Sequence, residues 1–352
     1  MKKIAIITIF DENNYGNRLQ NFATQEILKE HGFKVSTLPN TAYYNNQINL
    51  FKYYLKKIIN QLSYCFFKKN KRLKNFKAFD KKYIETGKFI HIKNTYKIVD
   101  RYDYFICGSD QIWNPYFSRL SPIDLLTFSP KEKNIALAAS FGVSQLEDQH
   151  KKICKDALSN FKAISVRENQ AKNIIHDIGF SNCTVLIDPT MMIDYDKWCS
   201  IEAKPSYLKK DFLVVYYLGE ISETRKTFIN KISHDNDLDI IYLCDIIFPQ
   251  YYNSGPDEFI YLVHHAKLVI TDSFHACVFS ILFKTPFYVF EREDDNVKMN
   301  SRIETLLSTF DLKDRLIKSY DSYDLEVDYS NIDLILNNER NKFNNFLDTS
   351  LY

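Results

Sequence analysis

Short apolar runs alternate with amphipathic segments along the chain, a pattern typical of α/β folds with parallel sheets. The pattern begins with an apolar strand over 4–10, a helix over 19–31 and a second strand over 34–38. Later strands are predicted over 104–107, 134–138, 163–166, 184–187, 212–218, 239–243, 267–270 and 286–290. Later helices are predicted over 222–234, 257–265, 275–284 and 300–310. The succession predicts doubly wound parallel sheets.

The length of the chain predicts two domains. At 352 residues it exceeds one ordinary domain. Periodicity is lost over 188–210, where Pro189 and Pro205 lie, so this segment is interpreted as a linker. We therefore expect two Rossmann-like domains, an N-terminal one over 1–195 and a C-terminal one over 205–330, facing across a cleft. Residues 331–352 are expected to form a helix that packs across both.

Composition narrows the class of protein. Hydrophobic residues make up 45% of the chain and charged residues 26%, which are values of a globular protein. A net charge of +2 argues against nucleic-acid binding. The seven cysteines have no metal-binding spacing, so we expect free thiols in a reducing compartment and no metal. The apolar N-terminal run is too short for a signal peptide, and a cytoplasmic location is expected.

The segment 266–287 is the most informative part of the sequence. An apolar strand leads into Thr271, Asp272 and Ser273, which are residue types that cap helices, and an apolar helix follows. His275 falls in the first turn of that helix. In a parallel α/β sheet such a junction lies at the carboxyl end of a strand, where ligands bind. Alternatively, these residues only cap the helix and pack.

Polar motifs elsewhere in the chain give this segment a context. They lie over 13–20, 107–115, 138–142, 164–168, 188–190, 255–259 and 271–275. Their order resembles that of the polysaccharide pyruvyl transferase family over roughly residues 3–310. The resemblance implies a fold like that of the type-B glycosyltransferases (GT-B), with the donor in the C-terminal half and the acceptor in the N-terminal half.

The resemblance also implies a reaction. An enolpyruvyl group passes from phosphoenolpyruvate to two hydroxyls of a sugar, which forms a pyruvate ketal on a capsular or exopolysaccharide precursor and releases phosphate. Binding this donor requires guanidinium groups and a helix N-terminus for its anionic oxygens. Protonating its methylene carbon requires a general acid. The reaction requires neither a metal nor a further cofactor.

Candidate donor-site residues follow from this chemistry. Arg167 comes after the strand over 163–166 and is the first candidate anion ligand, the alternative being a surface salt bridge with Glu168. His275 is the candidate general acid or phosphate ligand, because histidine titrates near neutral pH. Asp272 is expected to orient His275, to act as a base or to cap the helix. We expect Arg167 and His275 to face one pocket on the C-terminal side.

One departure from the family pattern concerns the donor. Some relatives carry an arginine two residues before the histidine, where this chain has Ser273. Arg302, at the start of a predicted helix, is the candidate that replaces the lost guanidinium; the alternative is a surface arginine. Glu258 lies near a helix start, where it either contacts the donor or complements the helix dipole.

Two polar segments are candidates for acceptor binding, because sugars are held by amides, hydroxyls and aromatic faces. The first is the predicted loop formed by Tyr15, Gly16, Asn17 and Arg18. The second contains Asp110, Gln111 and Trp113. The alternative for the second segment is a structural turn in which Trp113 fills the core between the lobes.

A basic and aromatic insertion, about residues 49–82, stands apart from the rest of the chain. Residues 51–82 contain eleven Lys and Arg against one acid, Asp80. Such a segment can lie on an anionic membrane surface, which would suit a lipid-linked acceptor. The alternative is a helical excursion packed on the first sheet with its lysines in water.

The sequence is also compatible with two other functions. One is a glycosyltransferase of the same fold that uses a nucleotide sugar. The other is a noncatalytic partner in polysaccharide assembly.

Overall fold

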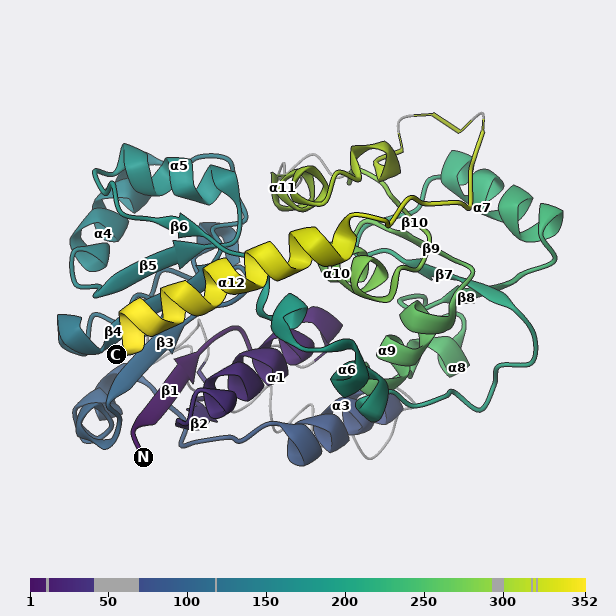
Figure 1. The fold of residues 1–352 in the computed structure, drawn as a ribbon. Helices are drawn as coiled ribbons and strands as arrows, with labels where there is room; N and C mark the ends of the chain where they lie inside the picture. Colours follow the sequence, from purple (N-terminus) through teal and green to yellow (C-terminus); the bar gives the residue numbers. More distant parts are fainter. Residues whose placement is uncertain (11–12, 41–69, 118, 293–300, 318, 321) are drawn as a thin grey trace. The chain divides into compact units, whose positions relative to one another are not determined.

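The computed structural model describes residues 1–10, 13–40, 70–117, 119–292, 301–317, 319–320 and 322–352. The chain divides into two compact units (Figure 1). Unit 1 comprises Met1–Met192 and Asn341–Tyr352, and unit 2 comprises Ile193–Arg340. Each unit contains one parallel sheet. The expected α/β fold with two Rossmann-like halves is therefore confirmed, whereas the cleft between the halves stays a prediction.

Unit 1 is built on a six-stranded sheet in the order β2-β1-β3-β4-β5-β6. Its strands are β1 (Lys3–Ile7), β2 (Lys34–Thr37), β3 (Tyr104–Cys107), β4 (Asn134–Ala139), β5 (Ala163–Val166) and β6 (Thr184–Val185). All neighbouring strands pair in parallel. Because β2 pairs on one side of β1 and β3 on the other, the order reverses between β1 and β3. Ligands of open α/β sheets bind beyond the carboxyl ends of the strands at such a switch point.

The helices of unit 1 are α1 (Tyr15–Glu30), α3 (Asn70–Tyr83), α4 (Asp148–Leu158) and α5 (Asn169–Asp177). Helix α1 begins at Tyr15 rather than at residue 19, because the side chain of Asn14 accepts a hydrogen bond from the backbone N–H of Asn17 at 3.2 Å and caps the helix. The expected polar loop over 15–18 is therefore the first turn of α1. Gly16 is helical there and does not mark a turn of the backbone.

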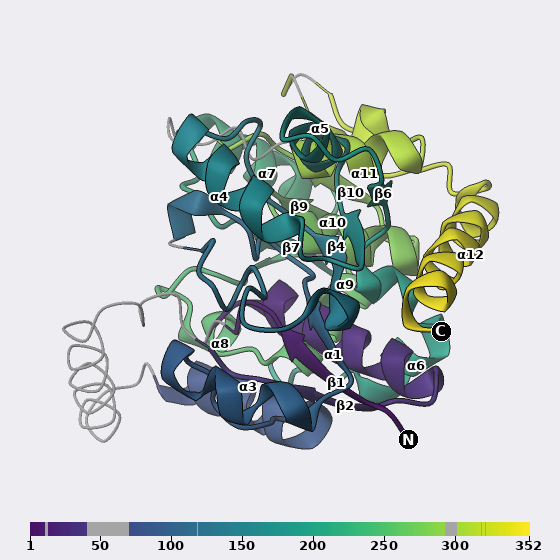
Figure 2. The same cartoon turned by 90° about the vertical axis from the view of Figure 1, so that its left-hand side faces the viewer.

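Helix α3 covers part of the basic segment and packs against α1 (Figure 2). Its Phe76 ring lies 5.1 Å from Tyr15, and its Phe79 ring lies 6.3 Å from Phe22. Both phenylalanines are buried, while the lysines of the helix are exposed. This part of the segment is a packed helix with its lysines exposed, and contact with a membrane surface stays a prediction. Residues 51–69 lie outside the described part.

Unit 2 repeats the topology of unit 1 with a four-stranded sheet in the order β10-β9-β7-β8. Its strands are β7 (Phe212–Tyr216), β8 (Asp239–Tyr242), β9 (Leu268–Thr271) and β10 (Phe287–Val289), all in parallel register. The order reverses between β7 and β9, which places a second switch point at the carboxyl ends of these two strands.

The helices of unit 2 are α6 (Tyr195–Ile201), α7 (Glu223–Asp235), α8 (Pro249–Tyr252), α9 (Pro256–His265), α10 (Phe274–Phe283) and α11 (Ser301–Thr309). Helix α6 lies inside the expected linker over 188–210, which therefore contributes a folded element to unit 2. Buried side chains of β7, α7 and β9, such as Leu213, Phe228 and Ile270, form one hydrophobic core.

The last helix, α12 (Ile332–Leu351), begins in unit 2 and ends in unit 1. In unit 2, Arg340 donates to Asp194 at 3.0 Å. In unit 1, Tyr104 donates its hydroxyl proton to the carbonyl of Leu351 at 2.9 Å. Among the described helices, none combines the length and the apolarity that a membrane span requires.

Candidate functional site

Asp272 joins three strand ends at the switch point of unit 2. It follows β9, and its carboxylate accepts hydrogen bonds from the backbone N–H groups of Leu218 at 2.8 Å and Gly219 at 2.9 Å, which follow β7. Arg292, which follows β10, reaches the same carboxylate with Nε at 3.3 Å. The side chain of Asp272 is 1% exposed. Its role in this structure is to fix the loops at the carboxyl edge of the sheet.

His275 lies at the same edge, in the first turn of α10. Its ring packs edge to face against Phe274, with the ring centroids 5.3 Å apart. The guanidinium of Arg302, from α11, lies 5.7 Å from the Phe274 ring centroid. Arg302 is buried, so the alternative of a surface arginine is excluded. One phenyl ring thus connects the predicted general acid with the predicted donor-binding arginine.

The carboxyl edge of unit 2 therefore has the electrostatics of an anion site. The N-terminus of α10 carries partial positive charge, and Arg292 and Arg302 add two full charges. The carboxylate of Asp272 offsets one of the two arginine charges. Desolvated guanidinium groups bind phosphate and carboxylate oxygens more strongly than exposed ones do, because the local dielectric is low.

Ser273 and Glu258 have structural roles in the described geometry. Ser273 is the N-cap residue of α10, and its backbone N–H donates to the Thr271 hydroxyl at 2.9 Å. Glu258 accepts a hydrogen bond from the backbone N–H of Gly255 at 2.9 Å and so closes the start of α9. Glu258 therefore caps α9, whereas the side chain of Ser273 makes no capping hydrogen bond, and donor contact by either residue stays a prediction.

Arg167 lies in unit 1, not in the C-terminal half where the donor was expected. Its guanidinium donates to Asp188 at 2.5 Å and to Asp110 at 3.1 Å, and its side chain is fully buried. Burial disfavours the charged form, but the carboxylates of Asp188 and Asp110 outweigh this effect and raise the pKa of Arg167. The alternative of a surface salt bridge is excluded, because Arg167 is buried. Because Arg167 and His275 fall in different units, neither unit alone contains the pocket predicted for them.

The Arg167 network extends to the switch point of unit 1. Asp110 follows β3 with a left-handed backbone (φ 63°), and it accepts a hydrogen bond from the side-chain amide of Asn17 in α1. Ser109 donates its hydroxyl proton to Asp188 at 3.2 Å. A non-glycine residue held at positive φ is uncommon and often marks a functional position. Asn17 and Asp110 are thus the two acceptor candidates that the structure brings together.

The other acceptor candidates lie in the interior of unit 1. The Trp113 ring is buried 5.2 Å from Phe141, and its indole N–H donates to the carbonyl of Asp124 at 3.2 Å. Trp113 therefore lies in the core of unit 1, whereas the alternative had placed it in the core between the lobes. The hydroxyl of Tyr15 is held by Arg72 of α3 at 2.8 Å. Gln111 accepts a hydrogen bond from Asn114 at 2.6 Å.

Arg18 pairs with Asp80, the one acid of the basic segment, at 2.8 Å. Burial raises the pKa of Asp80 to about 6, although Arg18 opposes the shift. The carboxyl group of Asp80 therefore binds its proton more tightly in the folded chain than in the unfolded chain.

A pH dependence of stability follows from the raised pKa of Asp80. The contribution of protonated Asp80 to the free energy of unfolding is fully present below about pH 4 and is lost as the pH rises through about 6. From pH 5 to pH 7, we expect the parent chain to lose about 1 kcal/mol of unfolding free energy relative to Asp80→Asn. Urea denaturation of both proteins at each pH measures the difference. An equal change in unfolding free energy in the two proteins would contradict the raised pKa of Asp80.

Comparison with known proteins decides the family. The family model for polysaccharide pyruvyl transferases matches residues 14–294, more than half of the chain. The chain belongs to the polysaccharide pyruvyl transferase family. No functionally curated protein matches the chain.

Solved structures give weaker similarities. The UDP-N-acetylglucosamine 2-epimerase of Neisseria meningitidis, bound to UDP-GlcNAc, is 10% identical with a TM-score of 0.47, and the match covers 97% of this chain and 100% of the epimerase. The epimerase of Rickettsia bellii is 10% identical with a TM-score of 0.45, covering 99% and 98%. MurG of Acinetobacter baumannii is 10% identical with a TM-score of 0.44, covering 98% and 95%. At these sequence identities and TM-scores, we derive no function from the three structures.

Two charged residues of this pyruvyl transferase family member were not predicted as site residues from the sequence. Arg292 lies two residues after the predicted strand over 286–290, so its position near a strand end was visible in the sequence. Asp188 lies in one of the family motifs and was given no role, yet it accepts from Arg167, Ser109 and Thr190. Its partners lie on separate elements, and no sequence pattern links them.

Proposed function

We propose that the chain is a pyruvyl transferase that binds phosphoenolpyruvate at the carboxyl edge of the unit 2 sheet and transfers its enolpyruvyl group to two hydroxyls of a sugar. The observation that carries the proposal is the juxtaposition of His275, the N-terminus of α10 and two arginines at one switch point. Membership of the family supports a transferase that acts on polysaccharide.

The charges of this edge suit the donor. Phosphoenolpyruvate carries a phosphate and a carboxylate, and it needs several hydrogen-bond donors that are fixed before it binds. The helix N-terminus supplies backbone N–H groups, and Arg302 and Arg292 supply guanidinium groups. The carboxylate of Asp272, itself fixed by Leu218 and Gly219, holds Arg292 in place. Asp272 is therefore a positioning residue in this proposal rather than the base.

The reaction conserves all protons of its substrates. His275 donates a proton to the methylene carbon, which becomes a methyl group, and a sugar hydroxyl attacks the adjacent carbon. The bond from that carbon to the phosphate oxygen breaks, and the second hydroxyl closes the ketal. One hydroxyl proton returns to His275 and the other leaves with phosphate.

The acceptor is assigned to unit 1. Asn17 and Asp110 combine an amide and a carboxylate at its switch point, and both groups bind sugar hydroxyls in other proteins. A capsular or exopolysaccharide precursor on a lipid carrier would suit the basic segment, whose described part exposes Lys71, Lys74 and Lys77. Contact with an anionic membrane surface stays a prediction.

Arg302→Ala is expected to weaken phosphoenolpyruvate binding by about tenfold to a hundredfold, because a charge-assisted contact contributes about 1.5 to 3 kcal/mol. Isothermal titration calorimetry measures the dissociation constants. Arg302→Lys keeps the charge and is expected to recover part of the affinity.

Arg315→Ala is the matched control for Arg302. Arg315 is also buried in unit 2 and also lies over an aromatic ring, with its guanidinium 5.1 Å from the Tyr288 centroid. It is expected to leave donor affinity unchanged. An unchanged dissociation constant in Arg302→Ala, or equal losses in both variants, would refute the role of Arg302.

A further inference from the structure

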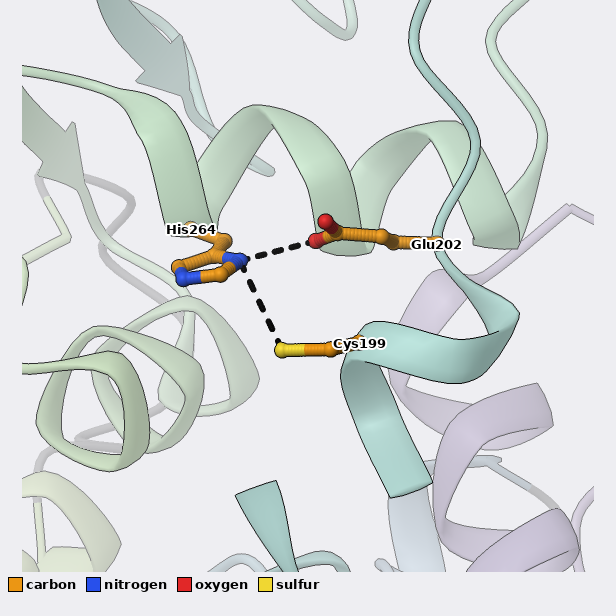
Figure 3. A group of neighbouring side chains, drawn as sticks. All are labelled: Cys199, Glu202 and His264. Carbon is orange, nitrogen blue, oxygen red and sulfur yellow. Dashed lines mark hydrogen bonds and ion pairs between the residues drawn. The ribbon is translucent and has the colours of Figure 1, made fainter. Parts of the chain in front are cut away.

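A second group of chemically reactive side chains lies in unit 2, away from the switch point. Cys199 lies in the last turn of α6 and Glu202 follows that helix, three residues later, so both project from the same side. His264 lies in the last turn of α9. One ligand atom from each residue lies within 4.8 Å of the others (Figure 3). Helix α9 leads into the amino end of β9, whereas His275 follows its carboxyl end.

The imidazole of His264 is oriented with Nδ1 toward the other two side chains. Nδ1 lies 2.8 Å from Oε2 of Glu202 and 4.0 Å from Sγ of Cys199. On the opposite side of the ring, Nε2 lies 2.7 Å from the hydroxyl of Tyr195. Phe283 stacks on the ring at 4.4 Å and 23°. Metal-binding histidines typically have their second nitrogen held in this way.

The carboxylate and the two helices are also held in place. His265 lies with Nε2 3.1 Å from Oε1 of Glu202, so each oxygen of that carboxylate has a histidine partner. The backbone N–H of Ala203 donates to the carbonyl of Asp257 at 3.1 Å, which ties the end of α6 to the first turn of α9. The ligand set is thus organised before any ion binds, which lowers the entropic cost of binding.

We propose that Cys199 Sγ, His264 Nδ1 and a Glu202 carboxylate oxygen form a zinc site. Thiolate, imidazole and carboxylate are the donor types of zinc, whereas Mg²⁺ and Ca²⁺ take oxygen ligands. One thiolate and one carboxylate neutralise the two charges of Zn²⁺. The three ligand residues are only partly buried, so water can occupy the fourth tetrahedral position.

Ion binding changes the protonation of two groups. The thiol of Cys199 loses one proton to solvent. The imidazole stays neutral, with its proton on Nε2, from which it donates to the oxygen of Tyr195. Because the site lies at the opposite end of β9 from His275, we expect zinc to stabilise the packing of α6 on α9 without taking part in pyruvyl transfer.

The test begins with chain stripped of metal by a chelator. Titration with Co²⁺ is expected to give a thiolate-to-metal charge-transfer absorption that saturates at one equivalent, and Zn²⁺ is expected to displace it. Cys199→Ser should abolish this absorption. Tyr195→Phe, which removes the partner of Nε2 and a hydrogen-bond partner of Cys199 but none of the three ligands, should weaken zinc affinity by about tenfold to a hundredfold at unchanged stoichiometry.

Cys244→Ser is the matched control, because Cys244 is another partly exposed thiol of unit 2. It should leave both the absorption and the affinity intact. His264→Gln, checked for native circular dichroism, should lower affinity by at least about a hundredfold, since loss of a ligand exceeds loss of its hydrogen-bond partner. Absence of the absorption from the parent chain, its persistence in Cys199→Ser, or unchanged zinc affinity in His264→Gln would overturn the site.

Discussion

Replacing Arg167 by methionine is expected to lower the free energy of unfolding by about 3 to 5 kcal/mol. The guanidinium is fully buried between Asp110 and Asp188, so its removal leaves two carboxylates in the interior with no cation between them. Such a loss lowers the melting temperature of a unit of this size by roughly 10 °C. Differential scanning calorimetry and urea denaturation measure the two effects.

Two further variants separate charge burial from ordinary loss of packing. Arg167→Met combined with Asp110→Asn and Asp188→Asn removes all three charges and is expected to be more stable than the single variant. Arg101→Met removes an exposed arginine of the same unit and should change stability by less than about 0.5 kcal/mol. A single variant within about 1 kcal/mol of the parent would show that the network does not stabilise unit 1.

His275→Asn is expected to have the largest effect on activity. A positioned general acid contributes about a hundredfold to ten-thousandfold in rate, so turnover should fall by that factor. Affinity for phosphoenolpyruvate should change by less than about tenfold, because the arginines and the helix N-terminus remain. Phosphate release from phosphoenolpyruvate, followed by ³¹P NMR with a panel of glycosides as acceptors, measures the rate.

His234→Asn is the control for His275→Asn, because the His234 side chain is 91% exposed on the same unit. It should retain full activity. If His275→Asn kept the parent rate, the proton would have to come from another group. If it lost donor binding and turnover equally, His275 would be a phosphate ligand instead of the acid.

The strands were predictable because buried parallel strands appear in the sequence as short apolar runs. Strand β4 (Asn134–Ala139) and the predicted run over 134–138 differ by one residue. Helix α4 was missed because only Cys154, Ala157 and Leu158 are buried along it, which leaves too narrow an apolar stripe. The start of α1 was missed because its buried polar side chains are satisfied by other elements, as when the Asn17 amide donates to Asp110. A first helical turn made of polar residues has the same sequence pattern as a loop.

The candidate site could be predicted only as far as local signals reach. The position of His275 in the first turn after a strand is visible in the sequence, and so is the position of Arg167 after another strand. What each of them contacts is not visible, because Arg167 finds Asp110 at a separation of 57 residues. The same limit hides the cluster of Cys199 and His264, which are 65 residues apart and meet only because α6 packs on α9. Cysteine spacing alone had predicted no metal.

Donor binding tests the central claim most directly. Isothermal titration calorimetry of the parent chain with phosphoenolpyruvate is predicted to show saturable binding, weakened by about tenfold to a hundredfold in Arg302→Ala and unchanged in Arg315→Ala. Thermal shift should show the same preference, since a ligand that binds only the native state raises its melting temperature. Binding of a uridine or guanosine diphosphate sugar with no binding of phosphoenolpyruvate would contradict the account and indicate a glycosyltransferase. Absence of binding by either donor class would indicate a noncatalytic partner.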